Sequence, residues 1–376
     1  MTIFIISETL TAGGAEWFSL RLARALQEEG NKVFFFVLRP DLVNEGLKSK
    51  FPDLPLITLP LPRVRVLVFL DRFINKIAGK YMLVEWANVK LLKKYIARHS
   101  PDVIHGHLIE SDLVAIKAND APQAHNVTTV HGDYIGALKA NKRISEISRL
   151  LKQLSGIAVI SDEQATILKE YYPDAASKIR KIYNGYPLPD KDFKDPDDTF
   201  FCFGMIARAV PEKGWKPLMD AFSLIKNEQV RLLLYGSGPY LDELNEANRD
   251  ERIIFRGFTN DPLSAISEMH VGLLPSYFTS ESLPTTVIEY MALGKPVIAT
   301  NVGEIKNMIL AEDGQSAGIL VEEIDTRAMI KPLYDAMTKM LEDKEFYLQK
   351  KSVSRKAFEK FSMDKCINAY LKLYKN

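Results

Sequence analysis

The sequence contains few of the residues from which disulfide or metal frameworks are built. Only Cys202 and Cys366 occur in 376 residues, far apart and outside any CxxC pattern. The six histidines are scattered, and no HExxH motif accompanies them. We therefore expect no disulfide framework and no metal site, and two free thiols fit a reducing, cytoplasmic compartment.

Long apolar runs and the common nucleotide-binding fingerprints are also missing. No stretch approaches the roughly 20 apolar residues that cross a bilayer, and the opening "MTIFIISETL" lacks the basic region of a signal peptide. Neither GxGxxG nor GxxxxGK[ST] occurs in the chain. These absences argue against a membrane-spanning protein, a dinucleotide-dependent dehydrogenase and a P-loop enzyme.

The charge balance argues against a nucleic-acid partner, since 49 basic side chains face 48 acidic ones. The charges are nevertheless unevenly spread. Residues 1–190 hold 25 basic and 20 acidic side chains, whereas the remainder holds 24 and 28. The first half is therefore the part suited to an anionic partner.

Strand-like apolar runs alternate with helix-like stretches along both halves of the chain. A chain of 376 residues exceeds the size of a single core, and the segment "YNGYPLPDKDFKDPDD" interrupts the alternation as a linker would. Continuous apolar strands favour parallel sheets covered on both faces. We predict two doubly wound α/β domains, residues 1–188 and 189–360, facing a central crevice, and a final helix at 361–376 that packs back on the first domain.

Two acids in the stretch "FTSESLPTTVIEYMALGKPVIAT" raise a specific question, because their surroundings look buried. The pattern predicts a loop through Leu283, a helix opened by Pro284 in its first turn and closed by Gly294, and then a strand. Glu281 precedes this helix and Glu289 lies inside it. The free N–H groups of the helix lie between the two acids, which suggests a ligand with hydroxyls at both ends and phosphate in the middle. Buried salt bridges are the alternative explanation.

Two further loops follow strands of the second half. Arg208 and Lys213 frame the turn in "GMIARAVPEKGW", where two cations would neutralise a diphosphate; a solvated basic loop is the alternative. The next strand ends in Gly236, Ser237 and Gly238, which allow close approach of a ligand to the backbone but also suit an ordinary tight turn.

The first half offers weaker signals. Gly13 and Gly14 follow the first strand and precede a helix. His131 ends the strand "NVTTV" and is predicted to emerge at the carboxyl edge of the sheet, whereas we assign His105 and His107 a structural role.

Taken together, these motifs resemble retaining GT-B glycosyltransferases of family 4, also called glycosyl transferases group 1. The resemblance rests on the Gly13-Gly14-x-Glu16 turn, His131-Gly132, an R-x4-K-G frame from Arg208, GxGP from Gly236, and E-x7-E followed by "GKPVIAT". It covers essentially the whole chain in the expected order and is most specific between residues 205 and 304.

The resemblance implies a nucleotide-sugar donor held mainly by the second domain. Glu289 would bind the ribose hydroxyls and Glu281 the donor sugar, while Arg208 and Lys213 would hold the diphosphate. His131 would assist near the reacting sugar, so the implied catalytic residues are His131, Arg208, Lys213 and Glu281. The implied donor-binding residues are Gly13, Gly14, Gly236, Ser237, Gly238, Phe258, Leu283, Pro284, Thr285, Thr286 and Glu289. Many members carry glycine where this chain has Pro284, which leaves the choice of donor sugar open.

The implied reaction needs no cofactor and no metal, because two cations and a helix N-terminus can stabilise the departing diphosphate. We expect a UDP- or GDP-hexose donor and a sugar or lipid-linked acceptor, in glycolipid, capsule, lipopolysaccharide or exopolysaccharide assembly. A GT-B epimerase or phosphorylase, or an inactive sugar-nucleotide-binding subunit, are the alternatives.

Residues 61–99 hold nine basic and two acidic side chains. Helical spacing places six apolar residues on one face and four basic residues roughly opposite. The apolar set is Leu67, Leu70, Ile74, Ile77, Tyr81 and Val84, and the basic set is Arg65, Arg72, Lys76 and Lys80. The segment is either an ordinary amphipathic helix with a solvated basic face or a docking face for an anionic membrane, which would make the protein peripheral on the inner face of the cell membrane.

Overall fold

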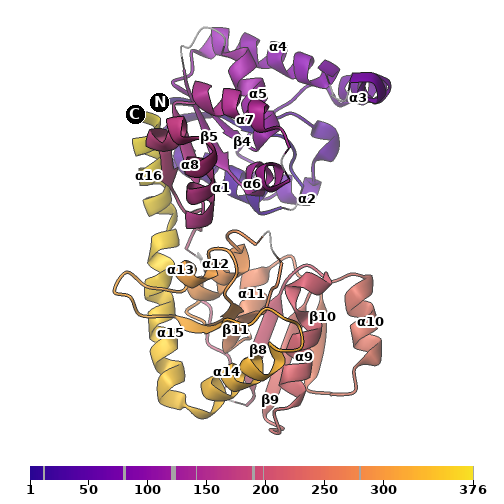
Figure 1. Cartoon of the computed structure of the whole chain (residues 1–376), viewed down its shortest axis with the longest axis vertical. Coiled ribbons are helices and arrows are strands. Elements are labelled where there is room, and N and C mark those ends of the chain that lie inside the picture. The colour runs from indigo at the N-terminus through magenta and orange to yellow at the C-terminus, as the bar shows by residue number, and fades with distance from the viewer. Residues whose placement is uncertain are drawn as a thin grey trace. The chain divides into compact units, whose positions relative to one another are not determined.

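The computed structural model divides the chain into two compact units, each with one parallel sheet (Figure 1). Unit 1 is Met1–Pro187 with Met363–Asn376, and unit 2 is Leu188–Ser362. The structure describes residues 1–11, 13–78, 82–119, 124–140, 142–188, 191–197, 199–278 and 281–375. The predicted α/β class with two doubly wound parallel sheets is therefore confirmed. The division falls one residue before the predicted boundary at 188/189.

Unit 1 contains a seven-stranded parallel sheet in the order β3-β2-β1-β4-β5-β6-β7. Its strands are β1 (Thr2–Ser7), β2 (Lys32–Val37), β3 (Leu56–Ile57), β4 (Val103–His107), β5 (His125–Val130), β6 (Gly156–Val159) and β7 (Ile179–Lys181). Its helices are α1 (Gly14–Glu28), α2 (Glu45–Lys48), α3 (Leu61–Ala78), α4 (Met82–His99), α5 (Ile109–Ala118), α6 (Gly132–Lys139), α7 (Ile144–Gln153), α8 (Asp162–Tyr171) and α16 (Met363–Lys375), with 3₁₀ turns at Pro40–Leu42 and Pro173–Lys178.

The first strand explains why both faces of this sheet are covered. Successive strand residues point to opposite faces, and all four residues from Ile3 to Ile6 are fully buried. Ile3 and Ile5 pack in the core formed with α1 and α16, whereas Phe4 and Ile6 pack in the core beneath α4 and α5. The last helix therefore completes the core of unit 1 although it is the end of the chain.

Unit 2 contains a six-stranded parallel sheet in the order β10-β9-β8-β11-β12-β13. Its strands are β8 (Phe201–Ile206), β9 (Val230–Tyr235), β10 (Ile253–Gly257), β11 (Val271–Leu274), β12 (Val297–Thr300) and β13 (Gly318–Val321). Its helices are α9 (Trp215–Ser223), α10 (Pro239–Ala247), α11 (Pro262–Ser267), α12 (Thr285–Ala292), α13 (Ile305–Met308), α14 (Ile330–Glu342) and α15 (Lys344–Phe358), with 3₁₀ turns at Pro211–Lys213 and Glu359–Phe361.

Helix α12 differs slightly from its prediction. Pro284 is the N-cap of the helix, which begins at Thr285 and not at the proline. The proline still suits this position, because it cannot continue a helical hydrogen-bond ladder from the preceding loop. Glu289 lies inside α12 and Glu281 in the loop before it, as the spacing predicts.

The predicted apolar face of residues 61–99 is wrong in part. The segment forms two helices, and Asp71 of α3 links them by accepting hydrogen bonds at 2.9 Å from the backbone N–H groups of Leu83 and Val84 in α4. The buried face of α3 contains Val64, Val68 and Asp71, whereas Leu70 is 44% exposed. The side chains of Ile74, Lys76 and Ile77, and residues Lys80 and Tyr81, lie outside the described part.

Candidate active site

The loop after β8 is held in place by the loop after β11. The indole Nε1 of Trp215 donates to the carbonyl of Arg208 at 3.0 Å, and Tyr277 N–H donates to Glu212 at 2.8 Å. Gly214 has a φ of +82°, and a Cβ there would collide with the carbonyl of Pro275. Only glycine fits such a close approach in the left-handed region. The loop that carries the two predicted cations is therefore attached to Pro275 and Tyr277, at the start of the loop after β11.

Lys213 and Glu281 form an ion pair although 68 residues separate them in sequence. Their side chains are only 9% and 10% exposed. The hydroxyl of Ser276 also donates to Glu281 Oε2 at 3.1 Å. A buried charge needs both a counter-charge and hydrogen bonds, and the Glu281 carboxylate has both, from Lys213 and Ser276. The structure thus joins two of the predicted catalytic residues.

Arg208 and Lys213 both lie near the aromatic ring of Phe278. The Arg208 guanidinium carbon is 5.7 Å and the Lys213 nitrogen 5.4 Å from its centre. Cations at such distances are attracted to the ring face. The Phe278 ring is therefore a shared neighbour of the two predicted diphosphate-binding cations.

Two residues that sequence reasoning missed, Gly303 and Glu304, contact the backbone of the loop that carries Glu281. Gly303, with a φ of +56°, lies so close that a Cβ would collide with the carbonyl of Glu281. The backbone N–H of Glu304 donates to Ser282 at 3.0 Å. The available signal was the glycine in "NVGEI", directly after the "GKPVIAT" strand.

The beginning of α12 presents unused hydrogen-bond donors. Within the described residues, no acceptor receives the backbone N–H groups of Leu283, Thr285 and Thr286. These groups carry the positive end of the helix dipole, which attracts anions. Glu289, one turn further on, is 7% exposed. The first turn of α12 therefore lies between the two acids of the E-x7-E frame, as predicted.

Tyr290 anchors α12 to the centre of the sheet. Its hydroxyl accepts a hydrogen bond from Ile206 N–H of β8 at 3.0 Å, and its ring lies where a Cβ on Gly272 of β11 would collide with it. Burial raises the pKa of this phenol above its usual value. The contact fixes the helix start relative to the Arg208 loop.

The glycines after β9 also make close contacts. A Cβ on Gly236 would lie 2.8 Å from the Ala207 carbonyl, and Gly236 N–H donates to Gly257 at 2.9 Å. Gly238 has a φ of +146°. Ser237 is exposed, and the Phe258 ring, just after β10, is 68% exposed. An exposed aromatic ring beside a glycine turn is a suitable surface for stacking a base.

In unit 1, Glu16 shapes the predicted Gly13-Gly14 turn. Its Oε1 accepts hydrogen bonds from the hydroxyls of Thr9 and Thr11 at 3.0 and 2.7 Å. A Cβ on Gly13 would collide with the same carboxylate. Gly14 is the first residue of α1 and is exposed. Glu16 belongs to the motif, but its sequence gave no indication of this bracing role.

His131 lies at the carboxyl end of β5 and is the N-cap of α6. It is 5% exposed, and its Nε2 is 3.2 Å from Nδ1 of His107. His105 hydrogen-bonds Tyr374 at 2.7 Å and Thr129 at 2.8 Å. His105 therefore has the structural role predicted for it, whereas His107 directly contacts a predicted catalytic residue, which sequence reasoning did not foresee.

Burial keeps these three imidazoles neutral. It lowers the pKa of His105 to about 3 and that of His131 to about 4. The pKa of His107 is well below its usual value, because burial is reinforced by the neighbouring His105 and His131. A protonated imidazole would lose its hydration here, and no carboxylate among the described residues hydrogen-bonds these rings.

A cavity of about 480 Å³ opens near the carboxyl ends of β1 and β2 in unit 1. Its apolar surface comes from Leu38, Val84, Leu113 and Val114, and its polar lining is Glu8, Arg39, Glu85, Asn88, Glu110, Arg143 and Glu146. In a doubly wound sheet, ligands bind at this edge, where the strand order reverses. The cavity therefore lies where a ligand of unit 1 is expected.

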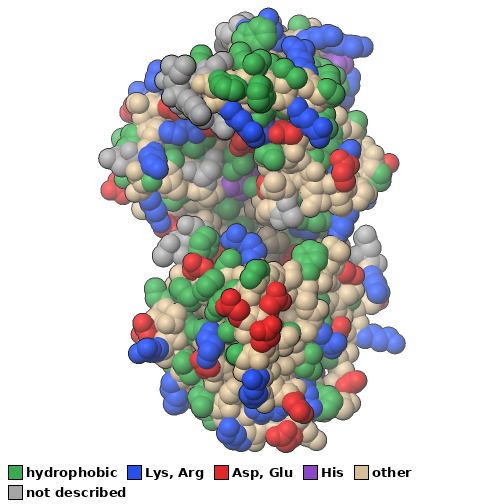
Figure 2. All heavy atoms as spheres, turned by 90° about the vertical axis from the view of Figure 1, so that its right-hand side faces the viewer, with side chains coloured by type: hydrophobic (Ala, Val, Ile, Leu, Met, Phe, Trp, Pro, Cys, Tyr) green, Lys and Arg blue, Asp and Glu red, His purple; other side chains and the backbone are tan. Residues whose placement is uncertain are grey.

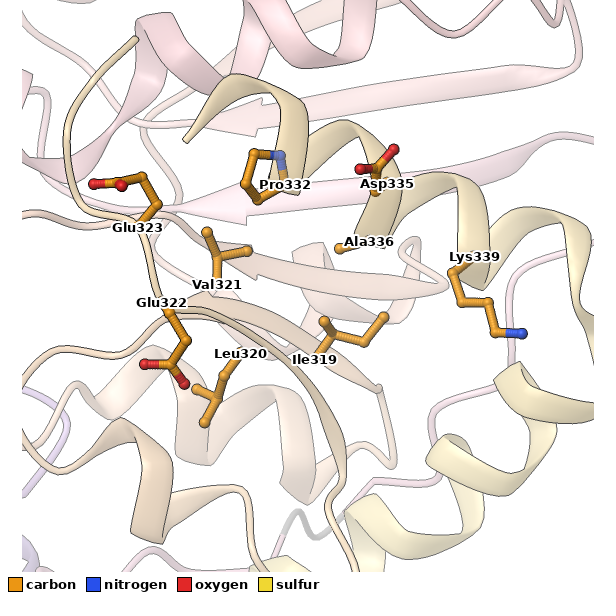
Figure 3. Close-up of a pocket in the computed structure, with 9 residues that line it drawn as sticks. All are labelled: Ile319, Leu320, Val321, Glu322, Glu323, Pro332, Asp335, Ala336 and Lys339. Carbon is orange, nitrogen blue, oxygen red and sulfur yellow. The ribbon is translucent and has the colours of Figure 1, made fainter. Parts of the chain in front are cut away.

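A second groove, of about 590 Å³, lies in unit 2 between the edge strand β13 and α14. Figure 3 shows Ile319 and Val321 of the strand beside Ala336 of the helix. None of the predicted donor-site residues lines it. The groove is therefore separate from the candidate active site.

The described residues contain no group of three His, Cys, Asp or Glu side chains arranged to hold a metal ion. Among the helices in that part of the chain, none is long and apolar enough to cross a membrane.

Two family models match the chain, one for each half. Residues 12–188 match Glycosyltransferase Family 4, and residues 197–343 match Glycosyl transferases group 1. The chain is 28% identical to N-acetyl-alpha-D-glucosaminyl L-malate synthase of Bacillus anthracis, over 97% of this chain and 94% of that protein. It is 26% identical to 2-deoxystreptamine glucosyltransferase of Streptomyces kanamyceticus, over 79% and 85% of the two chains.

Solved structures agree on the fold. The crystal structure of Anabaena HepE in complex with UDP aligns over 100% of both chains with a TM-score of 0.77 at 17% identity. Both family models, the relatives and this fold lead to one conclusion: the chain is a glycosyltransferase with the GT-B fold, and it belongs to the Glycosyltransferase Family 4 and Glycosyl transferases group 1 families.

Proposed function

We propose that the protein is a metal-independent retaining glycosyltransferase that moves a sugar from a UDP- or GDP-hexose to an acceptor hydroxyl. The observation that carries this proposal is the buried Lys213–Glu281 pair beside the unused N–H groups of α12. This arrangement combines a binding site for diphosphate with a carboxylate that can accept hydrogen bonds from sugar hydroxyls. The HepE structures that contain UDP and UDP-glucose support this class of donor.

The donor is assigned from its base to its sugar. The base stacks on Phe258 beside Gly236, Ser237 and Gly238, and Glu289 accepts hydrogen bonds from the ribose. Glu281 then accepts from hydroxyls of the donor sugar.

The diphosphate lies between these ends of the donor. Arg208 and Lys213 neutralise it, and the N–H groups of Leu283, Thr285 and Thr286 donate to it, with Pro284 setting the direction of the helix. On the unit 1 side, Gly13 and Gly14 approach the donor, and His131 acts near the reacting sugar.

The proposed chemistry uses this charge distribution in place of a metal ion. Negative charge grows on the diphosphate as the glycosidic bond breaks, and preorganised cations and N–H groups stabilise it most strongly at that moment. The departing phosphate oxygen takes the proton of the acceptor hydroxyl on the same face of the sugar, which gives retention of configuration.

We place the acceptor in the 480 Å³ cavity of unit 1. Sugars present apolar C–H faces and hydroxyl groups, and the cavity offers aliphatic side chains together with carboxylates that accept hydrogen bonds. Arg143 is engaged by Glu110 and Glu146 at 2.6 Å each, and Arg39 by Asp41 at 2.7 Å. Since both cations of the cavity already have acidic partners, an uncharged sugar acceptor fits it better than an anionic one.

The exposed side chains of helix α3 favour an additional partner, an anionic membrane surface. Val66, Phe69, Leu70 and Phe73 form a stripe at helical spacing and are 44–58% exposed. In Figure 2 hydrophobic side chains lie beside Lys and Arg at the end of unit 1 that carries α3. Exposed aromatic residues flanked by arginines are typical of helices that lie in a membrane interface. A protein with this surface would act on glycolipid or lipid-linked acceptors, in glycan or glycolipid assembly.

The donor assignment is tested by incubating the purified protein with UDP-, GDP- and ADP-hexoses and measuring slow donor hydrolysis, with and without excess EDTA. We expect one nucleotide class to be hydrolysed and the rate to persist in EDTA. Hydrolysis of none of the donors, together with no binding of UDP or GDP by calorimetry, would refute the donor assignment. Loss of activity that Mg²⁺ restores would refute metal independence alone.

A further inference from the structure

His107 and His131 share one hydrogen bond, and its direction determines what His131 can do. The atoms involved are Nδ1 of His107 and Nε2 of His131, 3.2 Å apart. Both rings are neutral at pH 7, because burial lowers both pKa values. A neutral imidazole carries one N–H and one bare nitrogen, so one ring donates and the other accepts.

The other nitrogen of His107 discriminates between the two directions. Nε2 of His107 is fully buried, and no hydrogen-bond partner reaches it in the described part of the chain. If His131 donated, the His107 proton would be on this Nε2, as a buried N–H without an acceptor. If His107 donates, the same atom is only a bare lone pair. Orphaned buried N–H groups are the rarer of the two in proteins, because they lose a water hydrogen bond without replacement.

The remaining ring nitrogen of His131 is Nδ1, and its surroundings show whether a ligand can contact it. Among the described residues, no partner hydrogen-bonds Nδ1 of His131. This nitrogen is also not fully buried, in contrast to Nε2 of His107. It is therefore the ring nitrogen that a ligand can reach. The rings around the pair are fixed: Phe18 of α1 lies edge-on to both histidines, and His105 stacks on His107 with centres 4.4 Å apart.

We infer that His107 is a positioning residue which, by donating from Nδ1, holds the proton of His131 on Nδ1 and makes His131 a hydrogen-bond donor to the sugar, not a base. This inference rests on the proposed function for the identity of the ligand, but the tautomer itself does not. A donor at this position binds a sugar oxygen and leaves the acceptor proton to the departing phosphate. His131 then orients the donor sugar and takes no proton in the reaction.

The direct test is a long-range ¹H–¹⁵N spectrum of the full-length protein labelled with ¹⁵N-histidine, at pH 7. The His131 ring is assigned by its disappearance in His131→Gln. We expect a protonated Nδ1 and a bare Nε2 for His131 and the same pattern for His107. A proton on Nε2 of His131 overturns the inference, whatever the enzyme activity proves to be.

Two substitutions of His107 separate positioning from packing. Asparagine places an amide N–H near the position of Nδ1, so His107→Asn should keep the His131 tautomer and hydrolyse donor within a few-fold of the unmodified rate. His107→Phe keeps the ring but removes the donor, so the His131 proton should no longer be confined to Nδ1 and kcat should fall at least tenfold with little change in KM. Equal activity of the two variants would refute the positioning role. If His107→Phe does not fold, the spectrum of the unmodified protein still decides.

Discussion

Both units have a parallel sheet, but the side chains near its carboxyl edge differ in charge between the two units. In unit 2 the loops after the strands hold a desolvated ammonium and a desolvated carboxylate, Lys213 and Glu281, in direct contact. In unit 1 the corresponding edge holds three buried imidazoles, His105, His107 and His131, which burial keeps uncharged. A diphosphate requires fixed positive charge, whereas an uncharged sugar can be held by hydrogen bonds. We therefore propose that unit 2 binds the charged part of the substrates and unit 1 their polar, uncharged part, and we call the two units the charge-binding half and the polarity-binding half.

This difference also determines which residues tolerate change. A charged pair depends on both partners, because the remaining one would be a buried charge without compensation. The stability that the neutral histidines contribute depends on pH, because acid would charge them and no carboxylate among the described residues is hydrogen-bonded to them. Unit 2 can therefore be tested by removing one member of its charged pair, and unit 1 by lowering the pH.

The largest effect is expected for Lys213→Ala in the charge-binding half. It removes the cation that we propose stabilises the departing diphosphate, so kcat for donor hydrolysis should fall about 10²- to 10³-fold. Lys216→Ala is the matched control, because Lys216 is 56% exposed and pairs with Asp220 on the surface of α9. Rates of Lys213→Ala within a few-fold of the control would remove Lys213 from the mechanism.

A smaller effect is expected for Glu289→Ala, which should weaken nucleotide binding by about 1.5–3 kcal/mol, since the ribose hydroxyls lose a charged acceptor. Titration calorimetry with the preferred nucleotide measures this directly. Glu243→Ala, on the exposed side of α10, is the control and should bind normally. Unchanged affinity in a folded Glu289→Ala protein would contradict the ribose assignment.

In the polarity-binding half, acid should destabilise unit 1. Unfolded histidines bind protons below about pH 6.5, but the buried ones do not until pH approaches their lowered pKa values of about 4 for His131 and about 3 for His105. Their contribution to stability is thus complete above pH 6.5 and is lost as pH falls. At pH 5 the loss is about 2 kcal/mol for each of these two histidines.

Hydrogen exchange measures this loss separately in each unit. Amides of β4 and β5 should lose protection between pH 7 and pH 5, after correction for the intrinsic exchange rate, and His125→Gln, an exposed control at the start of β5, should behave as the unmodified protein does. Equal protection at both pH values would show that the imidazoles are not desolvated as described.

The smallest effect per residue is expected on α3. Each basic residue near an anionic surface contributes about 1 kcal/mol, so replacing Arg63, Arg65 and Arg72 by Gln should weaken sedimentation with phosphatidylglycerol vesicles at low salt. Replacing Phe69 and Phe73 by Ser should remove the binding that persists at high salt, because apolar contact is not screened.

Surface arginines of unit 2 provide the control for this experiment. Arg231→Gln and Arg249→Gln remove the same type of charge away from α3 and should leave vesicle binding unchanged. If the unmodified protein does not sediment with the vesicles even at low salt, α3 is not a membrane-binding surface.

Local patterns in the sequence are enough to predict the fold and the order of the site residues along the chain. Apolar runs of strand length, separated by helical periods and glycine turns, allow little besides parallel sheets covered on both faces. Because such sheets place the loops after their strands at one edge, Arg208, Lys213, Glu281 and His131 could be assigned to that edge from local patterns alone.

Which of these residues are in contact depends on how the separate loops pack in three dimensions. The Lys213–Glu281 pair, the support of Glu281 by Gly303 and the contact of His107 with His131 join residues from different loops, and local spacing carries no information about such distances. Helix α3 was misread for a related reason. It has apolar residues on two faces, and only packing against α4 determines that Val64 and Val68 are buried while Phe69 and Leu70 face solvent.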